Sequence, residues 1–181
     1  MINTLIAQQL PLTGQHLIEA SAGTGKTFNI TRIYLRLLLE KKLTVQQILV
    51  MTFTKDATEE LRGRIESFIR QALSQWDELV QEDEYFTTLD QRVSADERQL
   101  LLNRALVNID EAAIFTIHGF CQRMLTQNAF ESGAQFESEF VTDQAKLMHQ
   151  VAADFWRRSF YHLPKMVAES VYDCWPSPSA L

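Results

Sequence analysis

The stretch that most restricts the fold of this chain is "ASAGTGKT", residues 20–27, where two of only six glycines stand directly before a lysine and a threonine. The residues before it, Gln15 to Ala20 ("QHLIEA"), predict a short apolar strand, and Lys26 to Glu40 predict a mostly buried helix. Between a strand and a helix, small residues let backbone N–H groups turn inward and surround phosphate oxygens without side-chain clashes. The pattern therefore predicts a phosphate-binding loop, or P-loop, at the start of that helix.

Lys26 and Thr27 are the predicted catalytic residues of this loop. Lys26 would reach the β- and γ-phosphates of ATP, and the hydroxyl of Thr27 would join the Mg²⁺ shell as the predicted metal ligand. Ala20 stands where the general pattern has glycine, and a compact residue still permits the turn. A glycine-rich turn beside a chance lysine is the alternative interpretation, which the strand before and the helix after disfavour. The predicted ATP-binding residues are Ala20, Ser21, Ala22, Gly23, Thr24, Gly25, Lys26 and Thr27.

Further along the chain, apolar runs alternate with helical spacings. Ile48 to Thr54 ("ILVMTFT") is a continuous apolar and β-branched run, as expected of a parallel strand covered on both faces, and Ala112 to Ile117 ("AAIFTI") is a third predicted strand. The acidic, less periodic residues 77–97 predict an exposed connection. Apolar residues at every third or fourth position predict helices over residues 55–76, 95–109 and 119–129. This alternation predicts an α/β fold with a layered parallel sheet and right-handed crossovers.

After residue 130 the pattern becomes helical only. Thr142 can cap a helix from Asp143 to about Tyr161, Pro164 ends it, and a shorter helical stretch follows over residues 166–175. Three strands and the beginning of a helical segment make an incomplete architecture. We therefore expect the tail of the chain to be a cut within a larger architecture.

Composition limits where the protein works and what it binds. Cys121 and Cys174 form no CxxC pair and no zinc pattern, which suits a reducing compartment. No apolar run approaches the about 18 to 20 residues that span a membrane, and the N-terminus lacks the basic region of a signal peptide. We therefore expect a cytoplasmic protein. The net charge of −6 means that any contact with DNA must be local.

An acidic residue that holds Mg²⁺ is the part that ATP hydrolysis needs and that the sequence shows least clearly. "LVNIDEA", residues 106–112, resembles an apolar strand that ends in Asp110 and Glu111. Helical spacing before it and the apolar strand directly after it favour a helix end instead. We expect the acidic pair beyond residue 181.

Three segments together resemble, in order and spacing, motifs I, Ia and Ib of the UvrD-like superfamily 1 DNA helicases: "EASAGTGKTFNI", "ILVMTFTKDATEELRGRI" and "AAIFTIHGFCQRML". The resemblance implies an ATP-dependent DNA helicase that uses ATP and Mg²⁺. It also implies a P-loop NTPase (RecA-like) three-layer sheet, incomplete here, with part of motor subdomain 1A over residues 1–130 and the start of the helical insertion 1B over residues 131–181. "NAFESG" and "ADFWRR" are similar to a helicase–exonuclease subunit of this family, which implies double-strand-break repair, recombination and partner subunits.

The resemblance also implies DNA-binding residues. Phe53 and Thr54 would line a groove for single-stranded DNA, where a base stacked on an aromatic ring gains roughly 1–3 kcal/mol. Thr116 and His118 match the family's T-x-H motif, which is associated with contact to the DNA backbone and its coupling to ATP. The alternatives are core filling for Phe53 and a structural hydrogen bond for His118.

Other charged side chains and other functions stay open at this stage. Lys55 and Arg123 are further candidates for phosphate contact, whereas the arginines of the helix after Lys55 are expected in a solvated face or in ion pairs. These are Arg62, Arg64 and Arg70, with Glu59, Glu60 and Glu66 as their acidic neighbours.

Two alternative functions remain open. One is a complete small P-loop kinase that uses Asp110 and Glu111 for Mg²⁺, and the other is a noncatalytic nucleotide-binding module.

Overall fold

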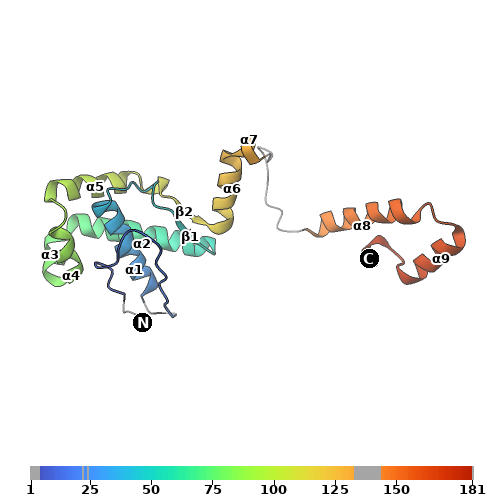
Figure 1. Cartoon of the computed structure of the whole chain (residues 1–181), viewed down its shortest axis with the longest axis horizontal. Coiled ribbons are helices and arrows are strands. Elements are labelled where there is room, and N and C mark those ends of the chain that lie inside the picture. The colour runs from blue at the N-terminus through green and yellow to red at the C-terminus, as the bar shows by residue number, and fades with distance from the viewer. Residues whose placement is uncertain (1–4, 22, 24, 133–143, 181) are drawn as a thin grey trace. The chain divides into compact units, whose positions relative to one another are not determined.

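The computed structural model describes residues 5–21, 23, 25–132 and 144–180, and Figure 1 shows its elements. The chain divides into two compact units, Met1–Asn128 and Ala129–Leu181, which are described separately below. Within the described residues, no helix combines the length and the apolar character that crossing a membrane requires.

The first unit is mostly helical and contains a parallel sheet. Its described elements are α1 (Lys26–Glu40), β1 (Val50–Thr52), α2 (Lys55–Ser74), α3 (Trp76–Glu82), α4 (Glu84–Asp90), α5 (Ala95–Val107), the 3₁₀ turn η1 (Ile109–Glu111), β2 (Ile114–Thr116) and α6 (Ile117–Gln127). The strands β1 and β2 run parallel, with Val50 opposite Ile114 and Thr52 opposite Thr116. The α/β class is confirmed, and both strands lie inside the predicted apolar runs.

The predicted strand over residues 15–20 is wrong. These residues belong to no regular element, and Leu17 in their middle is 87% exposed. A strand needs a neighbour to receive its backbone hydrogen bonds. In the described part of the chain the sheet has two strands rather than three, and neither of them pairs with residues 15–20.

The helix α1 has the predicted bounds and is the centre of the core. It contacts both α2 and α5, which also contact each other. The apolar face of α1 contributes Leu35 and Leu39, both fully buried, and α2 places Ile65 and Ile69 against the same core. Because α1 packs against α2 and α5, the predicted loop at its start is attached to a helix that the core holds in place.

The prediction of an exposed connection over residues 77–97 is also wrong. The segment forms α3 and α4, and Tyr85, Phe86 and Leu89 of α4 are at most 1% exposed. The ring of Phe86 lies 5.2 Å from that of Trp76 and 5.8 Å from that of Phe68. The sequence did not predict this helix because its buried apolar positions span little more than one turn and acidic residues surround them.

The second unit consists of short helical elements. They are α7 (Ala129–Ser132), α8 (Ala145–Phe160), α9 (Lys165–Cys174) and the 3₁₀ turn η2 (Pro178–Ala180). The helices over residues 143–161 and 166–175 are therefore found, but Thr142 and Asp143 lie outside the described residues. In α8 the ring of Trp156 packs edge-on against Phe160, with 4.8 Å between their centroids. Assignment of this unit to a helical insertion subdomain stays a prediction.

Candidate nucleotide loop and DNA-binding edge

The predicted P-loop owes its shape to glycine. Gly23 has φ 77° and Gly25 has φ 82°, both in the left-handed region that residues with a side chain rarely adopt. Gly25 is also the residue that caps the N-terminus of α1. Of the predicted ATP-binding residues, Ala22 and Thr24 lie outside the described residues. The two glycines thus allow the tight turn that leads the chain into the helix.

Lys26 folds back across this loop. Its Nζ donates a hydrogen bond of 3.0 Å to the carbonyl of Ala20, the first residue of the motif. The first turn of α1 contains no acidic side chain, so no carboxylate of that turn offsets its positive end. A phosphate group is the kind of ligand that such a helix start and an exposed lysine can share. Thr27, half-buried beside Lys26, has its hydroxyl in the same first turn.

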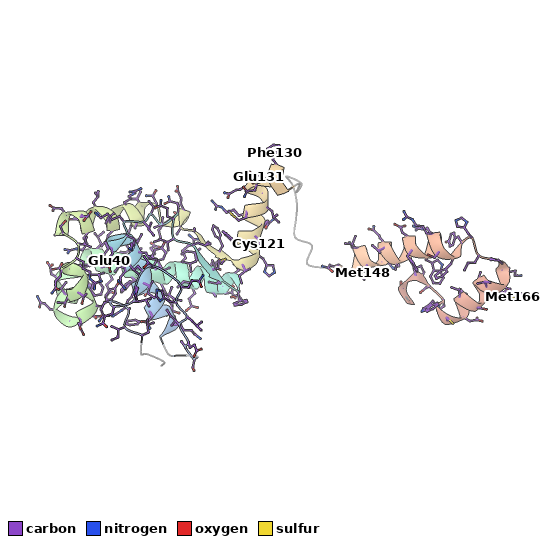
Figure 2. All side chains as sticks on the ribbon, viewed as in Figure 1. Glu40, Cys121, Phe130, Glu131, Met148 and Met166 are labelled. Atoms are coloured by element: carbon purple, nitrogen blue, oxygen red, sulfur yellow. The ribbon has the colours of Figure 1, made fainter. Side chains whose placement is uncertain are left out.

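Two arginines attach other segments to α1. Arg36, only 4% exposed, donates to the carbonyls of Ala7 at 2.6 Å and Leu10 at 2.7 Å. The same guanidinium pairs with Glu40 at 2.5 Å, and Arg92 reaches Glu40 at 3.1 Å. Burial alone would raise the pKa of Glu40, but the two arginines outweigh it and lower that pKa below its ordinary value. Figure 2 shows the Glu40 side chain among the packed helices of the first unit.

Arg32, one turn earlier on α1, lies between two aromatic rings. Its guanidinium carbon is 4.0 Å from the centre of the Phe28 ring and 4.6 Å from that of Tyr85, and it forms an ion pair with Asp83. The hydroxyl of Tyr85 donates to the carbonyl of Arg32 at 2.6 Å. Helix α4, missed by the sequence prediction, is therefore one of the supports of the nucleotide-loop helix.

The four predicted DNA-binding residues gather at one edge of the sheet. Since β1 and β2 are parallel and end together at Thr52 and Thr116, the residues that follow both strands lie at the same carboxyl edge. Thr54 caps α2 by accepting the amide of Ala57 at 3.2 Å, and Thr116 caps α6 by accepting the amide of Gly119 at 3.1 Å. We call residues 53–54 and 116–118 the carboxyl edge.

At the carboxyl edge the aromatic ring faces solvent. Phe53 is 87% exposed, so it does not fill the core, which was the alternative interpretation. His118 is exposed in the first turn of α6, and Lys55 is exposed at the first position of α2. The edge thus offers an exposed ring, two helix N-termini and nearby cationic or titratable groups. Those are the groups that a nucleic-acid strand can use.

The arginines of α2 divide into two kinds. Arg64 pairs with Glu60 and Arg70 with Glu66, each at 2.6 Å and one helical turn apart on the surface, as predicted. Arg62 contradicts that prediction, because its guanidinium donates to backbone carbonyls of residues 109–114. The guanidinium carbon of Arg123, in α6, lies 5.1 Å from the centre of the Phe115 ring, in β2.

Asp110 and Glu111 do not lie where a Mg²⁺ ligand of the loop is needed. They form η1, directly before β2, and so stand at the amino end of that strand, opposite the carboxyl edge. Glu111 accepts a hydrogen bond of 2.7 Å from the side chain of Gln46. No cluster of three or more metal-binding side chains occurs in the described ranges. The helix-end interpretation of these two residues is the one that the structure supports.

A left-handed glycine loop ahead of a buried helix, followed by parallel strands that each lead into a capped helix, is an arrangement typical of α/β proteins that bind phosphate groups. Residues 3–170 match the UvrD/REP helicase N-terminal domain, and the chain belongs to that family. The chain is similar to RecBCD enzyme subunit RecB of Escherichia coli K12, with 47% identity over 98% of this chain and 16% of the relative. It is 45% identical to the RecB subunit of Haemophilus influenzae Rd over 85% of this chain and 14% of that protein.

A third relative is the RecB subunit of Buchnera aphidicola subsp. Schizaphis graminum, 42% identical over 96% of this chain and 15% of that protein. The chain therefore spans about one sixth of the length of the curated relatives that it matches.

Proposed function

We propose that this chain is the ATP-binding N-terminal part of a RecB-like subunit. The whole protein would be an ATP-dependent DNA helicase with associated exodeoxyribonuclease activity, acting in double-strand-break repair and recombination. The observation that carries the proposal is the loop at the start of α1. Its two left-handed glycines and its returning lysine lie in a chain of the UvrD/REP helicase family.

ATP is the proposed ligand of residues 20–27. On binding, Lys26 would exchange the carbonyl of Ala20 for phosphate oxygens, which gives its ammonium a stronger, charge-assisted partner. Thr27 would hold Mg²⁺, which supplies neutralisation of the charge on the phosphates. The acidic pair that completes this metal site is proposed to lie beyond residue 181.

DNA is the proposed ligand of the carboxyl edge. Phe53 would stack on a base, while Thr54, Thr116 and His118 would face the backbone of single-stranded DNA. Because Thr54 and Thr116 also cap their helices, a strand bound there would meet the N-termini of α2 and α6. In the whole protein, ATP binding would close two RecA-like lobes, and the edge would alternately grip and release the strand as duplex DNA is separated.

The proposed partners are DNA, single- and double-stranded, and RecC-like and RecD-like subunits. The proposed location is the cytoplasm. A small P-loop kinase that uses Asp110 and Glu111 is disfavoured, because these residues lie at the amino end of β2, away from the carboxyl edge.

The test uses the native-length protein that begins with this sequence, assembled with its partner subunits. ATP hydrolysis is measured with and without single-stranded DNA, together with unwinding of a duplex. We expect stimulation by DNA in the natural protein and loss of both activities in Lys26→Ala. Lys41→Ala, an exposed lysine at the other end of the same helix, is the matched control and keeps both.

Two results would contradict the proposal. Normal unwinding by Lys26→Ala removes the P-loop assignment. ATP turnover that is indifferent to DNA in the natural protein removes the helicase assignment and favours the small-kinase alternative.

A further inference from the structure

Arg62, half-buried on α2, donates hydrogen bonds to backbone carbonyls of another segment. It stands on α2, two turns after the cap residue Thr54, and its guanidinium donates to four backbone carbonyls. One nitrogen, Nη1, reaches the carbonyls of Ile109 at 3.1 Å and Asp110 at 3.3 Å. The other, Nη2, reaches those of Ala112 at 3.4 Å and Ile114 at 3.3 Å. The side chain therefore binds the backbone from η1 to the first residue of β2.

The carbonyl of Ile114, which accepts a hydrogen bond from Arg62, faces away from β1. The carbonyl of Ala113 accepts the amide of Val50 at 2.9 Å and so points toward β1. Successive carbonyls of an extended chain alternate in direction, so that of Ile114 points to the other side. A planar guanidinium with five N–H donors can serve several such acceptors at once, which the single ammonium of lysine cannot do in the same geometry.

This contact lies at the amino end of β2 and connects the helix that follows one half of the carboxyl edge with the strand that precedes the other half. One half, Phe53 and Thr54, leads directly into α2, which carries Arg62. The other half, Thr116 and His118, follows β2, whose first residue Arg62 holds. The ladder between β1 and β2 contains only three residue pairs, and α2 also packs against β2. Arg62 adds a polar connection to this packing.

Arg62 also lies close to the nucleotide-loop helix. Burial raises the pKa of Tyr34 on α1 to about 12, and the positive charge of Arg62 acts in the opposite direction on that hydroxyl. The guanidinium thus connects α2 with β2, and its charge also acts on α1.

We propose that Arg62 is a positioning residue that sets the spacing between the Phe53–Thr54 half and the Thr116–His118 half of the DNA-binding edge. The proposal rests on the proposed function and adds a residue that has no contact with the reacting groups. Its neighbours on the same helix, Arg64 and Arg70, pair with glutamates on the surface and have no such role.

The experiment compares Arg62→Met, Arg62→Lys and the control Arg64→Met in the native-length complex. DNA-stimulated ATP hydrolysis gives kcat, KM for ATP and KM for single-stranded DNA. We expect Arg62→Met to raise KM for DNA about tenfold, as loss of several weak hydrogen bonds would, and Arg62→Lys to raise it about threefold. KM for ATP stays unchanged in both, and Arg64→Met leaves all three parameters unchanged.

The salt dependence separates positioning from direct contact. If Arg62 touched a DNA phosphate, its loss would reduce the slope of log KM for DNA against log salt by about one. A positioning residue leaves that slope as it is in the natural protein. A reduced slope in Arg62→Met, together with full recovery in Arg62→Lys, would overturn the proposal in favour of direct contact.

A merely structural role has its own signature. In that case kcat falls in proportion to the folded fraction while KM for DNA is unchanged, and the proposal is overturned. If Arg62→Met fails to assemble, Arg62→Lys decides by the same two parameters. Failure of the proposed function would be visible in the natural protein, as ATP hydrolysis that DNA does not stimulate, whereas failure of the Arg62 proposal is visible only in the variants.

Discussion

Arg36 offers a direct test of how the segment before the nucleotide loop is held. Residues 5–10 form a turn in which the amides of Gln9 and Leu10 both donate to the carbonyl of Ile6. The guanidinium of Arg36 attaches this turn to α1 through the carbonyls of Ala7 and Leu10. Arg36→Met keeps a side chain of similar length but removes every donor, so we expect the turn to open far more often.

The size of the effect follows from the hydrogen bonds that are lost. A hydrogen bond from a charged group contributes about 1.5–3 kcal/mol to stability, and Arg36→Met removes the two that hold the turn, from Nη1 to the carbonyls of Ala7 and Leu10. The lower end of that range gives about 3 kcal/mol for the pair. About 3 kcal/mol corresponds to a roughly hundredfold rise in the population of the open turn, since each 1.4 kcal/mol is tenfold.

Amide hydrogen exchange measures that population directly. We expect the exchange of the Gln9 and Leu10 amides to accelerate about a hundredfold in Arg36→Met. Arg92→Met is the control, since Arg92 lies on the surface and its loss costs under about 1 kcal/mol. Unchanged protection of both amides in Arg36→Met would show that the apolar contact of the buried Ala7 alone holds the turn.

Four further outcomes are expected. Gly25→Ala forces a side chain into a left-handed conformation at a cost of about 1–2 kcal/mol and should weaken ATP binding in a titration, whereas Gly63→Ala, inside α2 with open space around it, should leave binding unchanged. Thr116→Val removes the cap of α6 at a cost of about 1 kcal/mol, so the Gly119 amide should exchange faster, and Thr116→Ser should restore its protection. Phe86→Ala should destabilise the first unit by about 3–5 kcal/mol in urea unfolding followed by tryptophan fluorescence, and a loss under 1 kcal/mol would mean that the ring is not part of the core. The lowered pKa of Glu40 contributes stability that is present above its unfolded value of 4.5 and is lost as pH falls through the folded pKa. Acid should therefore lower the free energy of unfolding of the first unit in the natural protein, with a smaller loss in Arg36→Met, as urea unfolding at two pH values would measure.

Local patterns were enough to locate several elements of this protein. Helix α1 has the predicted bounds, because its apolar spacing and its buried face are properties of consecutive residues. The loop before it follows from the glycines, since Gly23 and Gly25 adopt backbone angles that few other residues can adopt. The surface pairs of Arg64 and Arg70 are also local, because partners four residues apart always face each other on a helix.

Elements that depend on distant partners could not be located in the same way. Residues 15–20 have the composition of a strand but lack a ladder within the described chain, and strand formation depends on that neighbour. Helix α4 owes its burial to rings from Phe68 and Trp76, which lie in other helices. Neither fact can be derived from the periodicity of the segment alone.

The same division applies to the candidate site. By itself the sequence determined the glycine loop for which we propose phosphate binding, the two strands that reach the carboxyl edge and the residue types found there, because motif spacing and side-chain chemistry are local. Only the tertiary structure decided that Phe53 faces solvent, that Thr54 and Thr116 cap adjacent helices, and that Arg62 binds the carbonyls ahead of β2. The physical reason is that the carbonyls that accept from Arg62 lie about fifty residues away in the sequence, so only the folded chain brings them within reach of its guanidinium.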